Sequence, residues 1–392
     1  MKILHVITGL NVGGAETMLA KVLEHRVGDA EVLSLLPPGR VAARIEQVGV
    51  AVHSAGMRQG RPSLRAMRQV RAIGRSVAPQ IVQGWMHHGN LAASLAAHAM
   101  RPAPRVVWNI RHSLSDIGHE KPLSRAVLHL GRMLSHTPAA IIYNSSVAAR
   151  QYEAFGFDAA RTIVIPNGFD CDRFRPRPAP RSALRQRFDI APGPIVVAMV
   201  ARLHPMKDAA NLIEAVARAR GEGHDLHLLM AGTGTDVLTP ALIGQLRSAL
   251  PRDRVTLAGE CNDVADWLPQ VDIVALSSAW GEGFPNILGE AMACGVPCVA
   301  TDVGDSAAIL GDCGEAVPPR NSAALAAALA RLAALGHDAR LALGALGRQR
   351  VLAKYTLDNI AGQYNALYEC VRITENASLG TSGAHAVWGR AV

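Results

Sequence analysis

A chain of 392 residues is long enough for two domains of ordinary size. Its content of 49% hydrophobic and only 18% charged residues excludes an intrinsically disordered protein. No run of about 18 apolar residues occurs, which excludes a membrane-spanning helix, and six cysteines without a paired metal-binding spacing are typical of reduced cytosolic thiols.

The net charge of +8 is concentrated in the first half of the chain. Residues 1–168 contain 19 Lys and Arg against 9 Asp and Glu, a net charge of +10, whereas the remainder contains 21 against 23, a net charge of −2. This excess favours an anionic partner such as nucleic acid, a lipid surface or a phosphate-bearing substrate. Only the charge suggests nucleic acid, because no recognition motif or aromatic platform accompanies it.

The first half alternates short apolar segments with helical patterns. Strands are predicted at residues 3–8, 31–36, 50–53, 80–84, 106–110, 140–143 and 162–165. Such alternation predicts an α/β fold with a parallel sheet covered by helices on both faces. The start MKILHVITG is interpreted as the first core strand and not as a signal peptide, because His5 interrupts the apolar run and no cleavage pattern follows.

A glycine-rich loop, TGLNVGGAE, follows the first strand, and it carries Gly9, Gly13 and Gly14 before a helix predicted from Ala15. The glycine spacing differs from the dinucleotide-binding fingerprint, and no acid follows the second strand. Because the loop lies at the carboxyl edge of a parallel sheet, it is expected to face a ligand cleft.

The segment SLRAMRQVRAIGR, residues 63–75, is predicted to be a basic amphipathic helix. Leu64, Met67 and Ile73 recur on its apolar side. The arginines at helical spacing, with two more just before the helix, are Arg58, Arg61, Arg65, Arg68, Arg71 and Arg75. Basic amphipathic helices favour anionic lipid surfaces. An ordinary surface helix whose apolar side packs on the sheet is an equally open interpretation, and the two are compatible.

Two strand ends in the first half carry candidate side chains. In QGWMHHGN, His87 and His88 close one strand and are candidate ligand contacts, with a structural histidine as the alternative. Arg111, in WNIRHS, ends the next strand and is a candidate for binding an anionic group, with a sheet-edge ion pair as the alternative.

A segment rich in Pro and Arg, residues 169–190, is predicted to be a linker. Beyond it, strands are predicted at 195–201, 226–231, 255–258, 273–277 and 299–302, and outer helices at 323–335 and 340–353. Two cations follow the first of these strands in VARLHPMKD, Arg202 at the strand end and Lys207 before the next helix. No Asp-x-Asp metal motif stands at a comparable strand end, so no metal ligand is predicted.

The stretch SSAWGEGFPNILGEAMACGVPCVATD, residues 277–302, combines strand, tight turn, helix and second strand, and it presents Glu282 and Glu290 eight positions apart. Gly281 and Gly283 flank Glu282, and a helix beginning near Asn286 would direct unpaired N–H groups at a phosphate or diphosphate. Carboxylates beside such a site are suited to accept hydrogen bonds from sugar or ribose hydroxyls.

The motif GEGFPNILGEAMACGVPCVATDVG resembles the hallmark of the retaining glycosyltransferases of family 4, which have the two-domain GT-B fold. The resemblance covers about residues 1–372 and is densest from Arg202 to Asp302. It implies two Rossmann-like doubly wound parallel-sheet domains with a cleft between them. The implied boundaries are an acceptor-binding domain at 1–168, a linker at 169–190, a nucleotide-sugar-binding domain at 191–355, a helix at 356–372 that crosses back, and a flexible tail at 373–392.

The resemblance also implies roles for single residues. Catalytic roles fall on Glu282, at the transferred sugar, on Arg202 and Lys207, at the departing diphosphate, and on His88. Many family members place a histidine over the transferred sugar, but here Trp85 stands at the commonest family position, and His88 is favoured over His87 as the sugar or acceptor contact. Arg111 is the implied contact for an anionic acceptor group. The implied donor contacts are Gly13, Gly14, Arg202, Lys207, Glu282, Gly283, Phe284, Pro285, Asn286 and, at the ribose, Glu290.

The resemblance therefore implies a metal-independent hexosyltransferase that acts with retention and needs no cofactor, because the UDP- or GDP-sugar is a substrate. The basic first half suggests that the acceptor is a lipid-linked saccharide of a surface polysaccharide or glycolipid. The expected location of the enzyme is cytoplasmic, on the inner face of the cell membrane, with an anionic membrane surface as partner and no nucleic acid. A GT-B nucleotide-sugar epimerase and a non-catalytic nucleotide-sugar-binding regulator are the alternatives.

Overall fold

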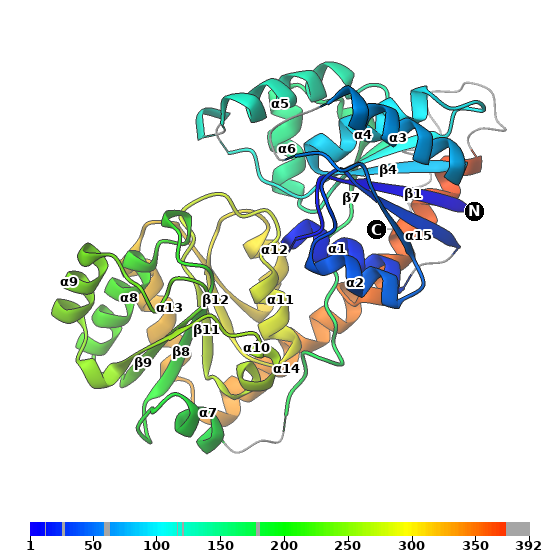
Figure 1. Cartoon of the computed structure of the whole chain (residues 1–392). Helices are drawn as coiled ribbons and strands as arrows, with labels where there is room; N and C mark the ends of the chain where they lie inside the picture. Colours follow the sequence, from blue (N-terminus) through cyan, green and yellow to red (C-terminus); the bar gives the residue numbers. More distant parts are fainter. Residues whose placement is uncertain are drawn as a thin grey trace. The chain divides into compact units, whose positions relative to one another are not determined.

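The computed structural model describes residues 1–11, 13–25, 28–58, 63–115, 117–119, 121–177 and 181–373. The chain forms two compact units (Figure 1). Unit 1 contains Met1–Gly168 and the chain from Leu357 onward, and unit 2 contains Phe169–Thr356. Of the predicted tail, only Ile373 is described, and Arg61 also lies outside the described residues.

Unit 1 is built on a seven-stranded parallel sheet with the strand order β3-β2-β1-β4-β5-β6-β7. The strands are β1 (Lys2–Ile7), β2 (Asp29–Ser34), β3 (Ala51–Ser54), β4 (Ile81–Trp85), β5 (Arg105–Ile110), β6 (Ala140–Tyr143) and β7 (Thr162–Val164). The central strands are buried almost throughout, because helices cover both faces of the sheet. The predicted parallel α/β architecture of this half is confirmed.

Seven α-helices are described in unit 1: α1 (Gly14–Glu24), α2 (Arg40–Gln47), α3 (Leu64–Val77), α4 (Met86–His98), α5 (Pro122–Leu134), α6 (Ser146–Phe155) and α15 (Leu357–Ile373), with short 3-10 turns at Ile117–His119 and Ala159–Arg161. Helices α1, α2 and α15 pack on one face of the sheet, where Leu19, Ile45 and Tyr364 share a core. Helices α3, α4, α5 and α6 cover the opposite face, and α4 packs against both α3 and α5.

The core-facing side of α3 differs from the predicted one. Ala66, Val70 and Val77 pack against the sheet and α4, whereas Leu64 and Met67 are exposed. Small residues face inward because α4 and the residues just after it approach closely: a Cβ added at Gly74 would lie 3.8 Å from Cβ of Ala96 in α4 and 2.8 Å from Cε of Met100. The arginines at 65, 68, 71 and 75 are exposed, as the sequence predicted.

Unit 2 contains a six-stranded parallel sheet with the order β10-β9-β8-β11-β12-β13. Its strands are β8 (Ile195–Val200), β9 (Leu226–Ala231), β10 (Val255–Gly259), β11 (Ile273–Leu276), β12 (Cys298–Thr301) and β13 (Gly314–Val317). The sequence did not predict β13. This edge strand of four residues begins with Gly314 and Glu315, two residue types that are depleted in strands.

The helices of unit 2 also form two layers. They are α7 (Arg181–Arg187), α8 (Ala209–Gly221), α9 (Pro240–Ala249), α10 (Val264–Trp267), α11 (Asn286–Ala293), α12 (Ser306–Leu310), α13 (Ser322–Ala334) and α14 (His337–Lys354), with 3-10 turns at Pro205–Lys207, Arg252–Arg254, Leu268–Gln270 and Gly311–Cys313. Helices α8 and α13 share one core with the sheet, and α10, α11 and α12 share another core on the opposite face. The predicted α/β architecture of this half is likewise confirmed.

The described residues of the predicted linker, 169–177 and 181–190, belong to unit 2. Phe169, Phe174, Leu184 and Ile190 are buried in the same core as α11. The Pro- and Arg-rich composition concealed these anchors, because they are five or more positions apart and form no apolar segment.

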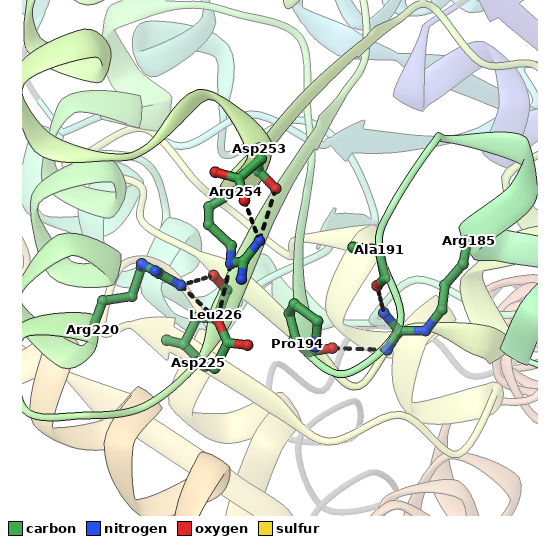
Figure 2. A network of polar contacts seen from close by, with 8 residues as sticks. All are labelled: Arg185, Ala191, Pro194, Arg220, Asp225, Leu226, Asp253 and Arg254. Atoms are coloured by element: carbon green, nitrogen blue, oxygen red, sulfur yellow. Dashed lines mark hydrogen bonds and ion pairs between the residues drawn. The ribbon is translucent and has the colours of Figure 1, made fainter.

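A network of arginines closes the amino end of the second sheet (Figure 2). Arg185 donates to the carbonyl oxygens of Ala191 and Pro194, both at 2.7 Å. Arg220 and Arg254 share the Asp225 carboxylate at 2.9 and 3.0 Å. Burial raises the pKa of Asp225, but hydrogen bonds from the two arginines outweigh it and hold the pKa below its usual range. With this end occupied by structural ion pairs, the opposite, carboxyl edge of the sheet is the place for a ligand.

Candidate functional site

Two cations stand where β8 ends, at the carboxyl edge of the second sheet. Arg202 follows the strand by two residues, and its side chain is exposed. Within the described part of the chain, its guanidinium makes no ion pair or side-chain hydrogen bond. Lys207 closes the 3-10 turn Pro205–Lys207, which His204 caps by accepting a hydrogen bond from the Met206 N–H at 3.2 Å. The loop thus holds one cation outward and one against the protein.

Lys207 forms an ion pair with Glu282 that joins the loop after β8 to the loop after β11. Ser278 donates a hydrogen bond of 2.6 Å to the same carboxylate oxygen, Oε1. Ser277 fixes the loop that carries Lys207, because its hydroxyl contacts the carbonyl oxygens of Lys207 and Asp208 at 2.8 and 3.0 Å. Both members of the ion pair are largely buried. The two residues lie 75 positions apart in the chain, and the structure brings them together.

The loop that carries Glu282 needs glycine at two points. Gly281 has a φ of +79°, a left-handed conformation that glycine adopts without strain. Gly304 has a φ of +63°, and a Cβ added there would lie 2.5 Å from the carbonyl oxygens of both Glu282 and Gly283. The Gly283 carbonyl accepts a hydrogen bond from the Asp305 N–H at 2.8 Å. The backbone around Glu282 is therefore held by the segment that follows β12.

Helix α11 begins directly after this loop. Pro285 precedes it with no side-chain cap, Asn286 is exposed at its first position, and Glu290 lies about one turn further. The helix start therefore presents backbone N–H groups and a partial positive charge near Glu282. Phe284 was predicted as a donor contact, but its ring is buried between Phe169 and Tyr355, at centroid distances of 6.1 and 5.5 Å. Only the backbone of Phe284 remains for a ligand.

The histidine pair of unit 1 lies at the end of β4. Trp85 is fully buried and donates to His5 Nδ1 at 3.1 Å, and α4 then begins at Met86 with a φ of 62°. His87 Nε2 lies 2.9 Å from the Tyr152 hydroxyl. Burial, with smaller contributions from His112 and His88, lowers the pKa of His87 to about 3, so its ring is neutral.

Among the described residues, His88 has neither the Tyr152 contact nor the His112 ring contact of His87. Desolvation lowers the pKa of His88 below its ordinary value. A neutral imidazole can both accept and donate a hydrogen bond, as a sugar hydroxyl requires. His87 is therefore the structural histidine of this strand end. The ligand contact predicted for His88 stays a prediction.

Arg111 is engaged by its own unit. Its guanidinium donates to the Tyr364 hydroxyl at 3.0 Å and to the Asn167 side chain, and it lies 5.7 Å from the centre of the Trp85 ring. Burial lowers the pKa of Arg111, and Tyr364 partly offsets that effect. Neither partner was identified from the sequence. Arg111 thus helps to hold α15 on the sheet, and its predicted acceptor contact stays a prediction.

The glycine-rich loop after β1 leads into α1, with Gly13 as the residue that precedes the helix. A Cβ added at Gly13 would lie 2.3 Å from Oε2 of Glu16, so the Glu16 carboxylate folds over this position. Burial raises the pKa of Glu16. Glu16 was not predicted as a site residue, although an acid in the first turn of a helix commonly satisfies the free N–H groups there.

Among the residues that the structure describes, no group of three or more His, Cys, Asp or Glu side chains is arranged to hold a metal ion. Within the same described ranges, none of the helices combines the length and the hydropathy needed to cross a bilayer.

Family models match both halves of the chain. Residues 12–173 match the model described as Glycosyltransferase Family 4, and residues 194–334 match the model described as Glycosyl transferases group 1. A curated relative, the GDP-mannose-dependent alpha-(1-6)-phosphatidylinositol monomannoside mannosyltransferase of Mycobacterium tuberculosis, is 31% identical over 289 residues, which cover 69% of this chain and 72% of the relative. The chain belongs to glycosyltransferase family 4. The resemblance inferred from the motif around Glu282 is confirmed.

A further relative and two similar structures extend this result. The D-inositol 3-phosphate glycosyltransferase of Geodermatophilus obscurus is 32% identical over 251 residues, 58% of this chain, and the match spans about half, 53%, of that relative's length. Anabaena HepE in complex with UDP superimposes with a TM-score of 0.82 at 22% identity, covering 94% of this chain and 100% of that chain. The sucrose-phosphate synthase of Thermosynechococcus elongatus gives a TM-score of 0.75 at 18% identity, with coverages of 95% and 100%. The predicted GT-B fold is confirmed.

Proposed function

We propose that this member of family 4 transfers a hexosyl unit from a nucleotide-sugar to a saccharide acceptor, with retention of the anomeric configuration. The observation that carries the proposal is the cluster at the carboxyl edge of the second sheet. There, Lys207 and Glu282 form a buried ion pair, and the cation of Arg202 stands exposed on the same loop as Lys207. An anionic leaving group and a polyhydroxylated sugar match this combination of charges and hydrogen-bond acceptors.

The proposed chemistry needs cations at the diphosphate. As the bond between the anomeric carbon and the diphosphate breaks, negative charge develops on the leaving oxygen, and Arg202, Lys207 and the start of α11 stabilise that charge. We assign this role to them without a metal ion. Glu290, about one turn into α11, is proposed to accept hydrogen bonds from the ribose hydroxyls.

Glu282 is proposed as a positioning and electrostatic group and not as the nucleophile. The Oε1 atom of Glu282 accepts hydrogen bonds from Lys207 and from Ser278. These hydrogen bonds occupy lone pairs of Oε1 and make the carboxylate a weaker nucleophile toward the anomeric carbon. Retention is then best served by attack of the acceptor hydroxyl on the same face of the sugar, assisted by the departing phosphate.

The donor is proposed to be a UDP- or GDP-hexose. One relative carries GDP-mannose in its name, and the fold is shared with a protein solved with UDP and with UDP-glucose. The acceptor is proposed to be a lipid-linked saccharide, which unit 1 binds on the cytoplasmic face of the membrane. The exposed arginines of α3 and the net charge of +10 over residues 1–168 support this part of the proposal.

Thermal-shift screening against a panel of nucleotide-sugars, followed by a transfer assay with lipid-linked acceptors, tests the proposal. A donor present at one hundred times its dissociation constant raises the free energy of unfolding by about 2.7 kcal/mol. Incubation of the donor alone separates the alternatives: conversion to an epimer would identify an epimerase, and binding without hydrolysis or transfer would identify a regulator. Either result would contradict the proposal.

A further inference from the structure

An open cavity of about 530 Å³ lies in unit 2 beside α8 and the start of α13, and we call it the α8 cavity. Its volume falls within the range of ligand-binding pockets, about 300 to 1,000 Å³. Helices α8 and α13 cover one face of the second sheet, whereas α11, whose start was assigned to the donor, covers the other. Arg202, Lys207, Glu282 and Glu290 are not among the described residues that line the α8 cavity. The lining side chains include those of Pro205, Asp208, Asn211, Glu214, Trp280 and Arg320.

Asn211 indicates that this cavity takes a ligand. Its side chain lines the cavity and is 8% exposed. Among the described residues, none accepts a hydrogen bond from its Nδ2 atom. The Asp208 carboxylate caps α8 by accepting from the Asn211 N–H at 3.3 Å, so the cap uses the backbone of Asn211 and not its amide. Since buried amide groups in proteins are almost always hydrogen-bonded, this donor indicates a partner that comes from outside the chain.

An aromatic ring forms a second wall of the α8 cavity. Trp280 stands four residues after the end of β11 and is partly buried, and the Arg320 guanidinium lies over its ring, 5.4 Å from the ring centre. Arg320 has a φ of 56°, and the strain of this conformation in a non-glycine residue occurs preferentially at functional sites. The face of an aromatic ring is negative and attracts weakly positive C–H groups. Trp280 therefore offers a surface on which the C–H face of a pyranose can pack.

The charges around the α8 cavity favour a neutral ligand. Asp208 and Glu214 contribute two carboxylates, which repel a phosphate or another anion, and Arg320 contributes a guanidinium, which disfavours a cation. Together with the Asn211 amide, these groups both donate and accept hydrogen bonds, as the hydroxyl groups of a sugar require. We infer that the α8 cavity binds a pyranose unit of a neutral saccharide, at a second site distinct from the proposed donor site.

The walls of the α8 cavity are held in place by the chain itself. The Ala279 N–H donates to the Met206 carbonyl at 2.8 Å. The Ser277 hydroxyl contacts the carbonyl oxygens of Lys207 and Asp208 at 2.8 and 3.0 Å. These contacts join the loop after β8 to the loop after β11, the same two loops that the ion pair of the proposed donor site connects. Because a rigid site loses little conformational entropy on binding, the few contacts of one pyranose are sufficient for measurable affinity.

The inference goes beyond the proposed function, and its test uses neither a nucleotide-sugar nor an acceptor. The full chain is titrated with methyl α-glucopyranoside, methyl α-mannopyranoside and methyl α-galactopyranoside, and the indole N–H signal of Trp280 is followed by ¹H–¹⁵N NMR. The variant Trp280→Phe identifies this signal by its absence. At least one glycoside is expected to shift the Trp280 signal, while the signals of the fully buried Trp85, Trp108 and Trp267 stay in place.

Asn211→Leu is the main test variant, because leucine has a similar shape and no polar group. It should raise the dissociation constant of the glycoside about tenfold or more, since the ligand loses its buried partner. Its Tm should equal that of wild type or exceed it, because the folded chain no longer buries a donor without an acceptor. Glu214→Gln should weaken binding about threefold or more. The matched control is Glu222→Gln, which changes an exposed residue just after α8 and should bind like wild type.

A variant of the donor side separates the two sites. Lys207→Met/Glu282→Gln changes the proposed donor site and should give the same glycoside titration as wild type. If this variant loses the titration and Asn211→Leu keeps it, the glycoside binds at the donor site and the inference is overturned.

The inference also fails if none of the glycosides shifts the Trp280 signal of wild type, or if Asn211→Leu binds as tightly as wild type. Should Asn211→Leu not fold, equal binding by Glu214→Gln and Glu222→Gln has the same consequence. Failure of wild type to transfer a hexosyl unit from any nucleotide-sugar would instead count against the proposed function alone.

Discussion

Replacement of Lys207 and Arg202 separates the contribution of a cation to catalysis from its contribution to the fold. Lys207→Met removes the partner of a largely buried carboxylate, and Glu282 then retains one hydrogen bond, from Ser278. Removal of one member of a buried ion pair costs about 3 to 5 kcal/mol, and the residual exposure of this pair favours the lower end. In a unit of this size each kcal/mol changes Tm by about 2 to 4 °C, which gives a decrease of about 6 to 12 °C.

Arg202→Met provides the matched comparison, because the Arg202 side chain is exposed and pairs with no described residue. Its Tm should stay within about 2 °C of wild type, since surface substitutions change stability by about 0.5 kcal/mol. Both variants should lose about 10²- to 10³-fold in kcat, because each removes a cation from the developing charge on the diphosphate.

The double variant Lys207→Met/Glu282→Gln completes the assay. It removes both charges, so its Tm should recover most of the loss seen in Lys207→Met, while its turnover stays low. Calorimetry gives Tm, and release of nucleoside diphosphate gives kcat. Wild-type turnover in Arg202→Met and Lys207→Met would refute the diphosphate assignment, and an unchanged Tm in Lys207→Met would refute the contribution of the ion pair to stability.

Three further outcomes are expected. EDTA should leave transfer unchanged, and full loss of activity that Mg²⁺ or Mn²⁺ restores would show that the diphosphate site is misassigned. Gly289→Ala should lower the free energy of unfolding of unit 2 by about 1 to 3 kcal/mol, measured in urea, because the new Cβ would lie 2.1 Å from the buried Phe169 ring. The control Gly244→Ala should be neutral or stabilising, because no atom lies within 4 Å of the new Cβ. Burial, with a smaller contribution from Arg254, lowers the pKa of the His227 ring to about 4. Because the ring binds a proton at higher pH in the unfolded chain than in the folded one, the free energy of unfolding should fall by about 3 kcal/mol as the pH drops from about 6.5 to 4. His227→Gln should flatten that dependence, and an unchanged pH profile in this variant would contradict the assignment.

The fold could be predicted from local sequence because apolar segments of four to six residues recur between helical patterns. Predicted strands agree with the observed ones to within about two residues, as at 226–231, where β9 coincides with the prediction. The core face of α3 could not be predicted in the same way. Side-chain size pointed to Leu64 and Met67, but the close approach of α4 selects Ala66 and Val70, and this distance is a tertiary property.

The site was partly predictable for a similar reason. Candidate residues stand at strand ends, and the sequence shows where strands end. It does not show which side chains meet: the partners of Arg111 and Glu282 come from segments 253 and 75 residues away. Glu16, which folds over Gly13, was missed because a single acid in a helix start carries little information without its geometry.

The two ends of unit 2 lie side by side. The Phe169 N–H donates to the Tyr355 carbonyl at 2.8 Å, and Phe169 pairs with Thr356 in a parallel bridge. A segment whose first and last residues touch can be excised or replaced with two adjacent junctions and without a new connecting chain. Residues 169–356 are therefore a natural cassette for chimeras, in which the corresponding unit of another family member is grafted onto this chain, while α15 must remain with unit 1 because Tyr364 and Tyr368 belong to its core.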